Sequence, residues 1–351
     1  MEQDRLPGLQ VARAVAALSI AYFHSWVALL RFPKDTAFPL PILTGHGWLA
    51  VDLFFAISGF VICLVVSRPG FGVGSFLIKR VFRLYPLWLA TLTIFAVLAL
   101  LWRAPTATET LGYFLYSATL LPTEHFPFYD IGWSLQHEMV FYLIAAVITP
   151  IFGLYGIATF LAASTIAFHS IEMPWYFSSL ASYHPEFLAG VLAFMVRPKL
   201  ARLGFWLPFS IGFASLWYFV AVWGGRDYVP IALFFLIVGF SNIRDMQSRW
   251  LKSVSAIGDA SYSIYLLHPL MFLVVSALVS KVTLPISAQE PIRAGCFVLI
   301  LSVSLASWKY FERPMIGRGN MLASRRVKRD GVNANKRLQW QAERPPSNEF
   351  L

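Results

Sequence analysis

The sequence predicts an all-α fold: a polytopic membrane protein with about ten transmembrane helices. Of its 351 residues, 58% are hydrophobic and only 13% are charged, whereas charged residues make up about 25% of a typical soluble protein. Apolar stretches close to the ~20 residues that a helix needs to cross the hydrocarbon recur along most of the chain. One membrane domain therefore accounts for most of the length.

The expected spans follow one another closely along this domain. We divide the fourth span from the fifth at Pro150, and this point of division is open. The eighth span is short for a membrane crossing. In chain order, the expected spans are 8–30, 46–66, 83–102, 133–150, 151–168, 182–196, 204–223, 228–241, 261–280 and 294–312.

The charges in the loops give the expected orientation. Cytoplasmic loops are enriched in Lys and Arg, so the more basic set of loops is expected in the cytoplasm. Both termini are then expected in the cytoplasm as well, which agrees with an even number of spans. The basic set holds Arg68, Lys79, Arg80, Arg83, Arg197, Lys199, Arg202, Arg244, Arg249 and Lys252. The opposite set is mixed and holds Arg31, Lys34, Asp35, Arg103, Glu109, Asp130, Glu172, Arg226 and Asp227.

The chain divides into a membrane domain over 1–317 and a polar, basic tail over 318–351. Five tail residues, Arg325–Arg329, include four basic side chains. This composition predicts a disordered cytoplasmic tail that lies against anionic lipid. The net charge of +10 reflects basic cytoplasmic loops, so membrane lipid is an expected partner and nucleic acid is not.

Motifs for metals and nucleotides are lacking. Cys63 and Cys296 both lie in apolar stretches and are too few for a disulfide framework or a metal site. The seven histidines are scattered, without the spacing typical of metal ligands. Gly70, Gly72 and Gly74 follow no strand, so they are a weak indication of a phosphate-binding loop. We therefore expect no metal.

The first span contains two basic residues, Arg13 and His24. They are eleven residues apart, so on an α-helix they project from nearly the same face, about 16 Å from each other along the axis. Ionisable groups inside a membrane are costly and usually face a cavity or a partner, which makes both candidate functional residues. A snorkelling arginine and a hydrogen-bonded bundle histidine remain the alternative.

Counting from the middle of each span places the ionisable residues at two levels. A histidine beside a carboxylate is oriented and made more basic, as a general base requires. Clustered arginines bind phosphates through paired hydrogen bonds. A phosphate-bearing donor and a hydroxyl acceptor would then meet near the histidine, unless the carboxylates cap helices or pair with arginines. The level of His24 holds Asp52, Glu138 and Glu186. The level nearer the cytoplasm holds Arg13, Arg80, Arg83 and Arg313.

Five blocks of sequence carry most of these residues, while Glu186 and Arg313 lie outside them. The first joins Arg13 to His24, and the third holds an Arg-x-x-Arg pair, Arg80 and Arg83. In this order, the blocks resemble the integral membrane acyltransferase-3 family, which O-acylates extracytoplasmic glycans. The resemblance is spread over most of the chain. The blocks are 13–24, 47–60, 79–86, 132–143 and 261–269.

The resemblance implies an acyl-coenzyme A donor, expected to be acetyl-CoA, on the cytoplasmic side. It also implies a sugar hydroxyl of a glycan or lipid-linked saccharide as the acceptor on the far side. It makes His24 the catalytic residue and Arg13 its essential companion. Details at Gln10, at Arg13–Ala14 and around Glu138–Tyr142 are similar to the exopolysaccharide-modifying branch. The esterase-like domain fused to some members has no counterpart here.

Our hypothesis is therefore an inner-membrane O-acyltransferase. His24 acts as a general base, or alternatively forms an acyl-histidine intermediate. Asp52 or Glu138 orients it, with Asp52 favoured. Arg13, Arg80 and Arg83 hold the phosphates and pantetheine arm of the donor.

Other interpretations stay open at this stage. A secondary transporter or flippase of a polar lipid or glycan would also hold an intramembrane histidine and carboxylates. A scaffold subunit would leave the buried ionisable groups unexplained. Ser261, Tyr262 and His268 suit hydrogen bonding within the bundle as well as a site lining.

The longest loop, from Arg103 to Asp130, is expected outside the cytoplasm. Its stretch 111–121 is too short to cross the bilayer. The loop also holds Pro105, Pro122 and Pro127 among aromatic and small residues. We expect it to dip into the membrane or to fold over the site, giving acceptor sugars aromatic surfaces for stacking.

Cysteine labelling tests this topology. In a protein whose Cys63 and Cys296 have been replaced, Glu109→Cys should react with a membrane-impermeant maleimide in cells with a permeabilised outer membrane. Ser75→Cys, in a basic loop, should be spared. Labelling at position 75 would contradict the sidedness. Protection of position 109 that persists after the inner membrane is opened would contradict the exposed loop.

Overall fold

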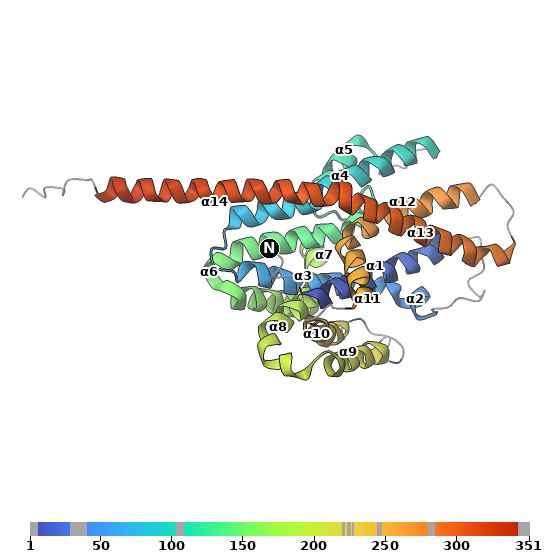
Figure 1. Cartoon of the computed structure of the whole chain (residues 1–351), viewed down its shortest axis with the longest axis horizontal. Helices are drawn as coiled ribbons and strands as arrows, with labels where there is room; N and C mark the ends of the chain where they lie inside the picture. Colours follow the sequence, from blue (N-terminus) through green and yellow to red (C-terminus); the bar gives the residue numbers. More distant parts are fainter. Residues whose placement is uncertain are drawn as a thin grey trace, which may run out of the picture.

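The computed structural model describes residues 6–28, 41–102, 109–219, 222, 226, 228–243, 248–279 and 285–342. Within these ranges, every regular element is helical (Figure 1). The longer helices are α1 (Pro7–Ala28), α3 (Ala50–Val66), α4 (Val73–Trp102), α6 (Trp133–Ser170), α8 (His184–Leu200), α9 (Trp206–Tyr218), α10 (Val229–Ser241), α11 (Arg249–Asp259), α12 (Ser261–Val279), α13 (Gln289–Ser307) and α14 (Arg313–Ala342). Shorter helices are α2 (Pro41–His46), α5 (Leu111–Ala118) and α7 (Trp175–Ala181).

The all-α class is confirmed, and each predicted span coincides with helix where the structure describes it. The helix of the third predicted span, α4, begins at Val73, ten residues before the predicted start of that span. By length and composition, five stretches of the described residues could each cross a membrane. The number of spans and the side of the termini remain predictions. The five stretches are Leu43–Val66, Val73–Leu101, Asp130–Ser170, Ser261–Val279 and Glu290–Val327. Of the loop charges used for orientation, Arg31, Lys34, Asp35, Arg103, Asp227 and Arg244 lie outside the described residues, as does Pro105.

The break between the fourth and fifth predicted spans falls within α6. The structure places it at Gly153, three residues after Pro150. Gly153 has φ 62° and ψ −156°, a backbone conformation that residues with a Cβ rarely adopt. The helix is therefore interrupted at a glycine, which tolerates this backbone conformation. Pro150 lies within the helical part that precedes the interruption.

The helix α1 lies at the centre of the bundle. It packs against α3, α10, α11 and α12. Its small side chains at Ala12, Ala16, Ala17 and Ala21 are fully buried or nearly so, and small residues let neighbouring helices approach closely in a membrane protein. This packing holds both basic residues of α1, Arg13 and His24, among other helices.

The helices α3 and α8 approach each other through two glycines. A methyl group at Gly59 would overlap the backbone carbonyl oxygen of Phe187, and one at Gly190 would overlap that of Ala56. Each glycine thus removes the side chain that would separate the two backbones. The close approach fixes the side chains that α3 and α8 turn toward each other.

The C-terminal segment differs from the predicted disordered tail. After α13, the chain passes through a π-helical turn, Trp308–Glu312, and continues as α14 to Ala342. The first part of α14 packs against α4, where Gly319 contacts Phe82 and Ala323 is fully buried. The packed first part of α14 provides a formed helix to which further turns can be added at low cost. The rest of α14 extends past the bundle (Figure 1). The proposed boundary at residue 317 lies inside this helix, and residues 343–351 lie outside the described part.

The α3–α8 contact yields a stability prediction. Gly190→Ala should lower the free energy of unfolding by about 1–3 kcal/mol, because the added methyl group forces two backbones apart. Thermal unfolding of the purified protein in detergent would measure this. The matched control is Gly295→Ala in α13, where an added Cβ meets no atom within 4 Å. Equal unfolding temperatures for both variants would contradict the tight contact.

Candidate active site

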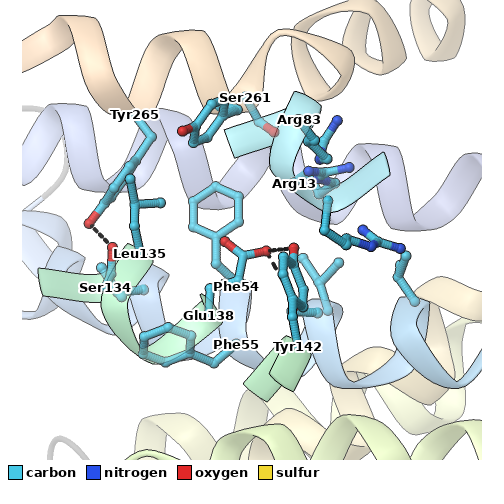
Figure 2. A pocket seen from close by; sticks show the side chains of 16 residues that line it. Arg13, Phe54, Phe55, Arg83, Ser134, Leu135, Glu138, Tyr142, Ser261 and Tyr265 are labelled. Atoms are coloured by element: carbon cyan, nitrogen blue, oxygen red, sulfur yellow. Dashed lines mark hydrogen bonds between the residues drawn. The ribbon is translucent and has the colours of Figure 1, made fainter. Parts of the chain in front are cut away.

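A cavity of about 230 Å³ lies among α1, α3, α4, α6 and α12. Arg13, Arg80 and Arg83 line it, so we call it the arginine pocket. Arg80 and Arg83 are three residues apart on α4 and therefore share one helix face. Three cations that the sequence places on one level thus meet in one cavity. Figure 2 shows Arg13 and Arg83 at one end, Tyr265 and Ser134 at the other, and Glu138 between them.

Hydrogen bonds and ring contacts hold the polar groups of the arginine pocket. Glu138 accepts hydrogen bonds from Tyr142 and, at 3.4 Å, from Ser58. The Arg80 guanidinium lies 5.0 Å from the centre of the Tyr142 ring and 5.3 Å from that of Phe76. Glu138, which the sequence places beside His24, is therefore built into the arginine pocket.

Behind this pocket lies Glu312, only 2% exposed. One of its oxygens lies 3.7 Å from Arg83 Nη1, and the other accepts a hydrogen bond from Ser263 at 2.9 Å. Three arginines and one carboxylate, Glu138, line the pocket, so its lining carries more positive than negative charge. Within the described residues, the buried Nε of Arg13 has no hydrogen-bond partner. An excess cation and an unsatisfied buried donor are the features of a site for an anionic ligand.

A second cavity, of about 540 Å³, contains His24, and we call it the histidine pocket. Aromatic side chains dominate its lining, including Phe95, Tyr129 and Trp133, while Asp130 adds a carboxylate. The histidine pocket lies near the C-terminal end of α1, whereas Arg13 lies near the N-terminal end. The two basic residues of the first span therefore line two different cavities.

The partner of His24 is another histidine. His24 Nδ1 lies 2.7 Å from Nε2 of the fully buried His268, and the two rings stack with centres 5.0 Å apart. His268 Nδ1 lies 2.9 Å from the carbonyl oxygen of Ile264 and must donate to it. In a neutral His268 ring, Nε2 is then the acceptor, so His24 Nδ1 donates to it. This tautomer leaves a lone pair on His24 Nε2, which is what a base or a nucleophile needs.

Tyr265 and Ser134 stand between the two pockets. Their hydroxyl groups are 2.6 Å apart, and Tyr265 also donates to the carbonyl oxygen of Ile131 at 3.2 Å. Both hydroxyl residues line the arginine pocket, whereas Ile131 lines the histidine pocket. The ring of Tyr265 lies 6.1 Å from that of His268. A wall one side chain thick therefore separates the cationic cavity from the histidine pair.

Comparison with known proteins identifies the family of this chain. Residues 6–311 match the family model described as acyltransferase domain, acyltransferase 3. This chain belongs to the acyltransferase-3 family. It is an acyltransferase and, given its apolar helices, a multi-pass membrane protein, which decides against the transporter and scaffold interpretations.

Three relatives resemble this acyltransferase. The exopolysaccharide production protein ExoZ of Rhizobium meliloti (strain 1021) is 30% identical over 79% of this chain and 93% of its own length. The putative acetyltransferase ORF330 of Acidianus two-tailed virus is 25% identical over 84% of this chain and 92% of its own. Protein 2 in the picA locus of Rhizobium radiobacter is 38% identical over 26% of this chain and 45% of its own. No solved structure matches the chain.

The geometry corrects one prediction about this acyltransferase: neither Asp52 nor Glu138 hydrogen-bonds His24 in the described structure. Asp52 lines neither pocket, and its carboxylate instead accepts from Arg226 at 2.6 Å, while Glu186 accepts from the same guanidinium at 3.1 Å. Depth along a span is shared by residues on every face of a helix, so it did not reveal that Asp52 faces α8 and the loop of Arg226. Asp52 thus does pair with an arginine, but with Arg226 rather than with one of the arginines at the level nearer the cytoplasm.

Two further residues of the candidate site could not be assigned from the sequence. Glu312 was not singled out, although a carboxylate at the end of an apolar span is itself a signal of a functional site. For His268, the sequence is consistent both with hydrogen bonding within the bundle and with a place in the site. Only tertiary contacts show that it faces His24.

Proposed function

We propose that this protein is an inner-membrane O-acyltransferase that moves an acyl group from acyl-CoA to a hydroxyl of an extracytoplasmic glycan. The observation that carries the proposal is the pair of adjoining cavities, one cationic and one with a histidine free to act as a base. The name of the relative ExoZ supports an exopolysaccharide or a similar surface glycan as acceptor. The name of the viral relative supports an acetyl group, with acetyl-CoA as donor.

The arginine pocket is the proposed site of the donor. Coenzyme A carries phosphates, and guanidinium groups bind these through paired hydrogen bonds. The excess positive charge and the unsatisfied Nε of Arg13 fit such a ligand, whereas neither calls for a neutral sugar. Glu138 would keep the arginines in place from within the same pocket. Since Arg80 and Arg83 belong to the predicted cytoplasmic set, the donor would enter from the cytoplasm.

Transfer would take place beside His24. Its Nε2 accepts the proton of a sugar hydroxyl while the sugar oxygen attacks the thioester carbon. The new C–O bond forms, the C–S bond breaks, and the proton passes to the leaving sulfur, which gives an ester and free CoA. In the other mechanism, Nε2 of His24 attacks the thioester carbon first, and the C–S bond breaks to release CoA. The sugar oxygen then attacks the acyl-histidine, the N–C bond breaks, and the sugar proton is released, for example to His24 Nε2. Either mechanism needs the acyl group to reach His24 from the arginine pocket, past Tyr265 and Ser134, whose hydroxyl groups are 2.6 Å apart.

Replacing His24 tests the proposed chemistry. His24→Ala should lower acetyl transfer by about 10²–10⁴-fold, the usual contribution of general acid–base catalysis, and should leave the unfolding temperature near that of wild type. The assay is acceptor-dependent release of CoA from acetyl-CoA by the purified protein in detergent, with de-O-acylated exopolysaccharide as acceptor. His268→Ala should lower kcat. His268→Gln should recover part of kcat, because the glutamine amide can accept from Nδ1 of His24 and donate to the carbonyl oxygen of Ile264. Full transfer by His24→Ala would refute the assignment.

Replacing Arg83 tests the donor site. Arg83→Ala should weaken acetyl-CoA binding about tenfold or more, because a charge-assisted hydrogen bond is lost. Arg83→Lys should restore only part of the affinity, since lysine lacks the paired donors. Isothermal titration calorimetry gives both values, and unfolding temperatures check that Glu312 tolerates the change. The matched control is Lys79→Ala, an exposed cation on the same helix that does not line the pocket. Equal affinity in all three variants would contradict the donor site.

A further inference from the structure

A third cavity, of about 350 Å³, adjoins the histidine pocket, and we call it the side pocket. The two cavities share two lining residues, Phe126 and Trp133. The side pocket then continues away from His24 between the loop before α6 and the α7 region, where Ser179 and Ser182 line it. A ligand that reaches His24 therefore has a second compartment next to it.

The lining of the side pocket has the chemistry of a carbohydrate site. Neutral hydrogen-bonding groups come from Thr123, Gln136, His137 and the serines, beside the aromatic faces of Phe126 and Trp133. Aromatic rings offer an apolar face to the C–H groups of a sugar ring, while amides and hydroxyls bind its hydroxyl groups. The buried Nδ1 of His137 has no hydrogen-bond partner within the described residues, so it has capacity for a ligand.

The charges of both adjoining cavities favour a neutral ligand. Glu124 lines the side pocket and Asp130 lines the histidine pocket, and none of the described residues that line either cavity is a Lys or an Arg. Carboxylates repel the phosphates of the donor, which the three arginines attract beyond Tyr265 and Ser134. The compartments on this side of the wall are thus suited to the acceptor.

The side pocket is built from a loop that the protein holds in place. Tyr113 donates to the carbonyl oxygen of Phe126 at 2.6 Å, and Tyr116 donates to that of Pro122 at 2.9 Å. The side-chain amide of Gln136 donates to the carbonyl oxygen of Leu121 at 2.6 Å. On the other side, the Trp133 ring is packed by His137 and Tyr183, with ring centres 5.7 and 5.1 Å away. A preformed site avoids part of the entropy cost of binding.

We propose that the side pocket binds the sugar unit next to the one that is acylated, so that the enzyme recognises at least two linked sugars of its acceptor. This inference rests on the proposed transfer to a glycan and extends it. Trp133 and Phe126, common to both cavities, contact the chain where it passes from one compartment to the other. The acylated position would then be chosen by where the neighbouring sugar binds.

Acceptor fragments of defined length test the proposal. The host cell's exopolysaccharide is de-O-acylated with mild alkali, partly hydrolysed, and separated into fragments of one, two, three and four sugars. Acetyl transfer from acetyl-CoA to each fragment is followed by mass spectrometry. Wild-type protein should have a KM for fragments of two or more sugars that is at least about tenfold below that for the single sugar, the effect of one or two added hydrogen bonds.

Two variants confine the test to the side pocket. His125→Ala removes an exposed lining side chain, and Ser179→Trp fills the cavity. Both should raise the KM for fragments of two or more sugars about tenfold, leave the KM for the single sugar unchanged, and leave acetyl-CoA binding unchanged. His169→Ala, an exposed histidine at the end of α6 that lines neither cavity, is the control.

The outcomes separate the two proposals. If wild type acylates every fragment with the same KM, or the variants affect the single sugar as strongly as longer fragments, the side pocket is not a sugar site, although transfer to glycan stands. If wild type acylates no fragment and no intact polysaccharide, the proposed acceptor fails and this inference fails with it.

Discussion

The cost of placing charge inside a membrane bundle governs the arrangement of this protein. An ionised side chain in the hydrocarbon costs several kcal/mol unless it has a partner or a polar cavity. One cluster answers this cost from within the chain, since Asp52 and Glu186 together bind the guanidinium of Arg226. The other cluster keeps an excess of arginine, with the Nε of Arg13 unsatisfied. Charge that the protein does not neutralise itself is charge available to a ligand.

Two helices connect the compartments of the proposed site. The helix α1 carries Arg13 to one cavity and His24 to the other. The helix α12 supplies Tyr262 to the first cavity and His268 as the partner of His24. The buried alanines of α1 allow α12 to approach it closely. Any shift of α1 along its axis would therefore move both ends of the site at once.

The histidine pair also has an energetic rationale. A carboxylate beside His24 would form a buried ion pair whose desolvation cost can exceed the attraction of its charges. A stacked, hydrogen-bonded pair of neutral imidazoles fixes the ring of His24 without introducing charge into an aromatic pocket. The wall formed by Tyr265 and Ser134 keeps this pocket apart from the arginines. Base and cations can then be held in one bundle without acting on each other directly.

The sequence by itself determined the helical segments and the position of each polar residue along its helix. Apolar runs of fixed length give the helices, and the rise per residue gives the spacing of Arg13 and His24 along one of them. Both are local properties of the chain, and spacing on one helix also put Arg80 beside Arg83.

Only the tertiary structure decided which helix faces meet. The direction in which Asp52 points depends on the glycine contact between α3 and α8 and on Arg226, 174 residues away. His268 meets His24 across a separation of 244 residues. Depth is set by the helix on which a residue lies, whereas partnership is set by the packing of helices distant in sequence, which no local pattern records.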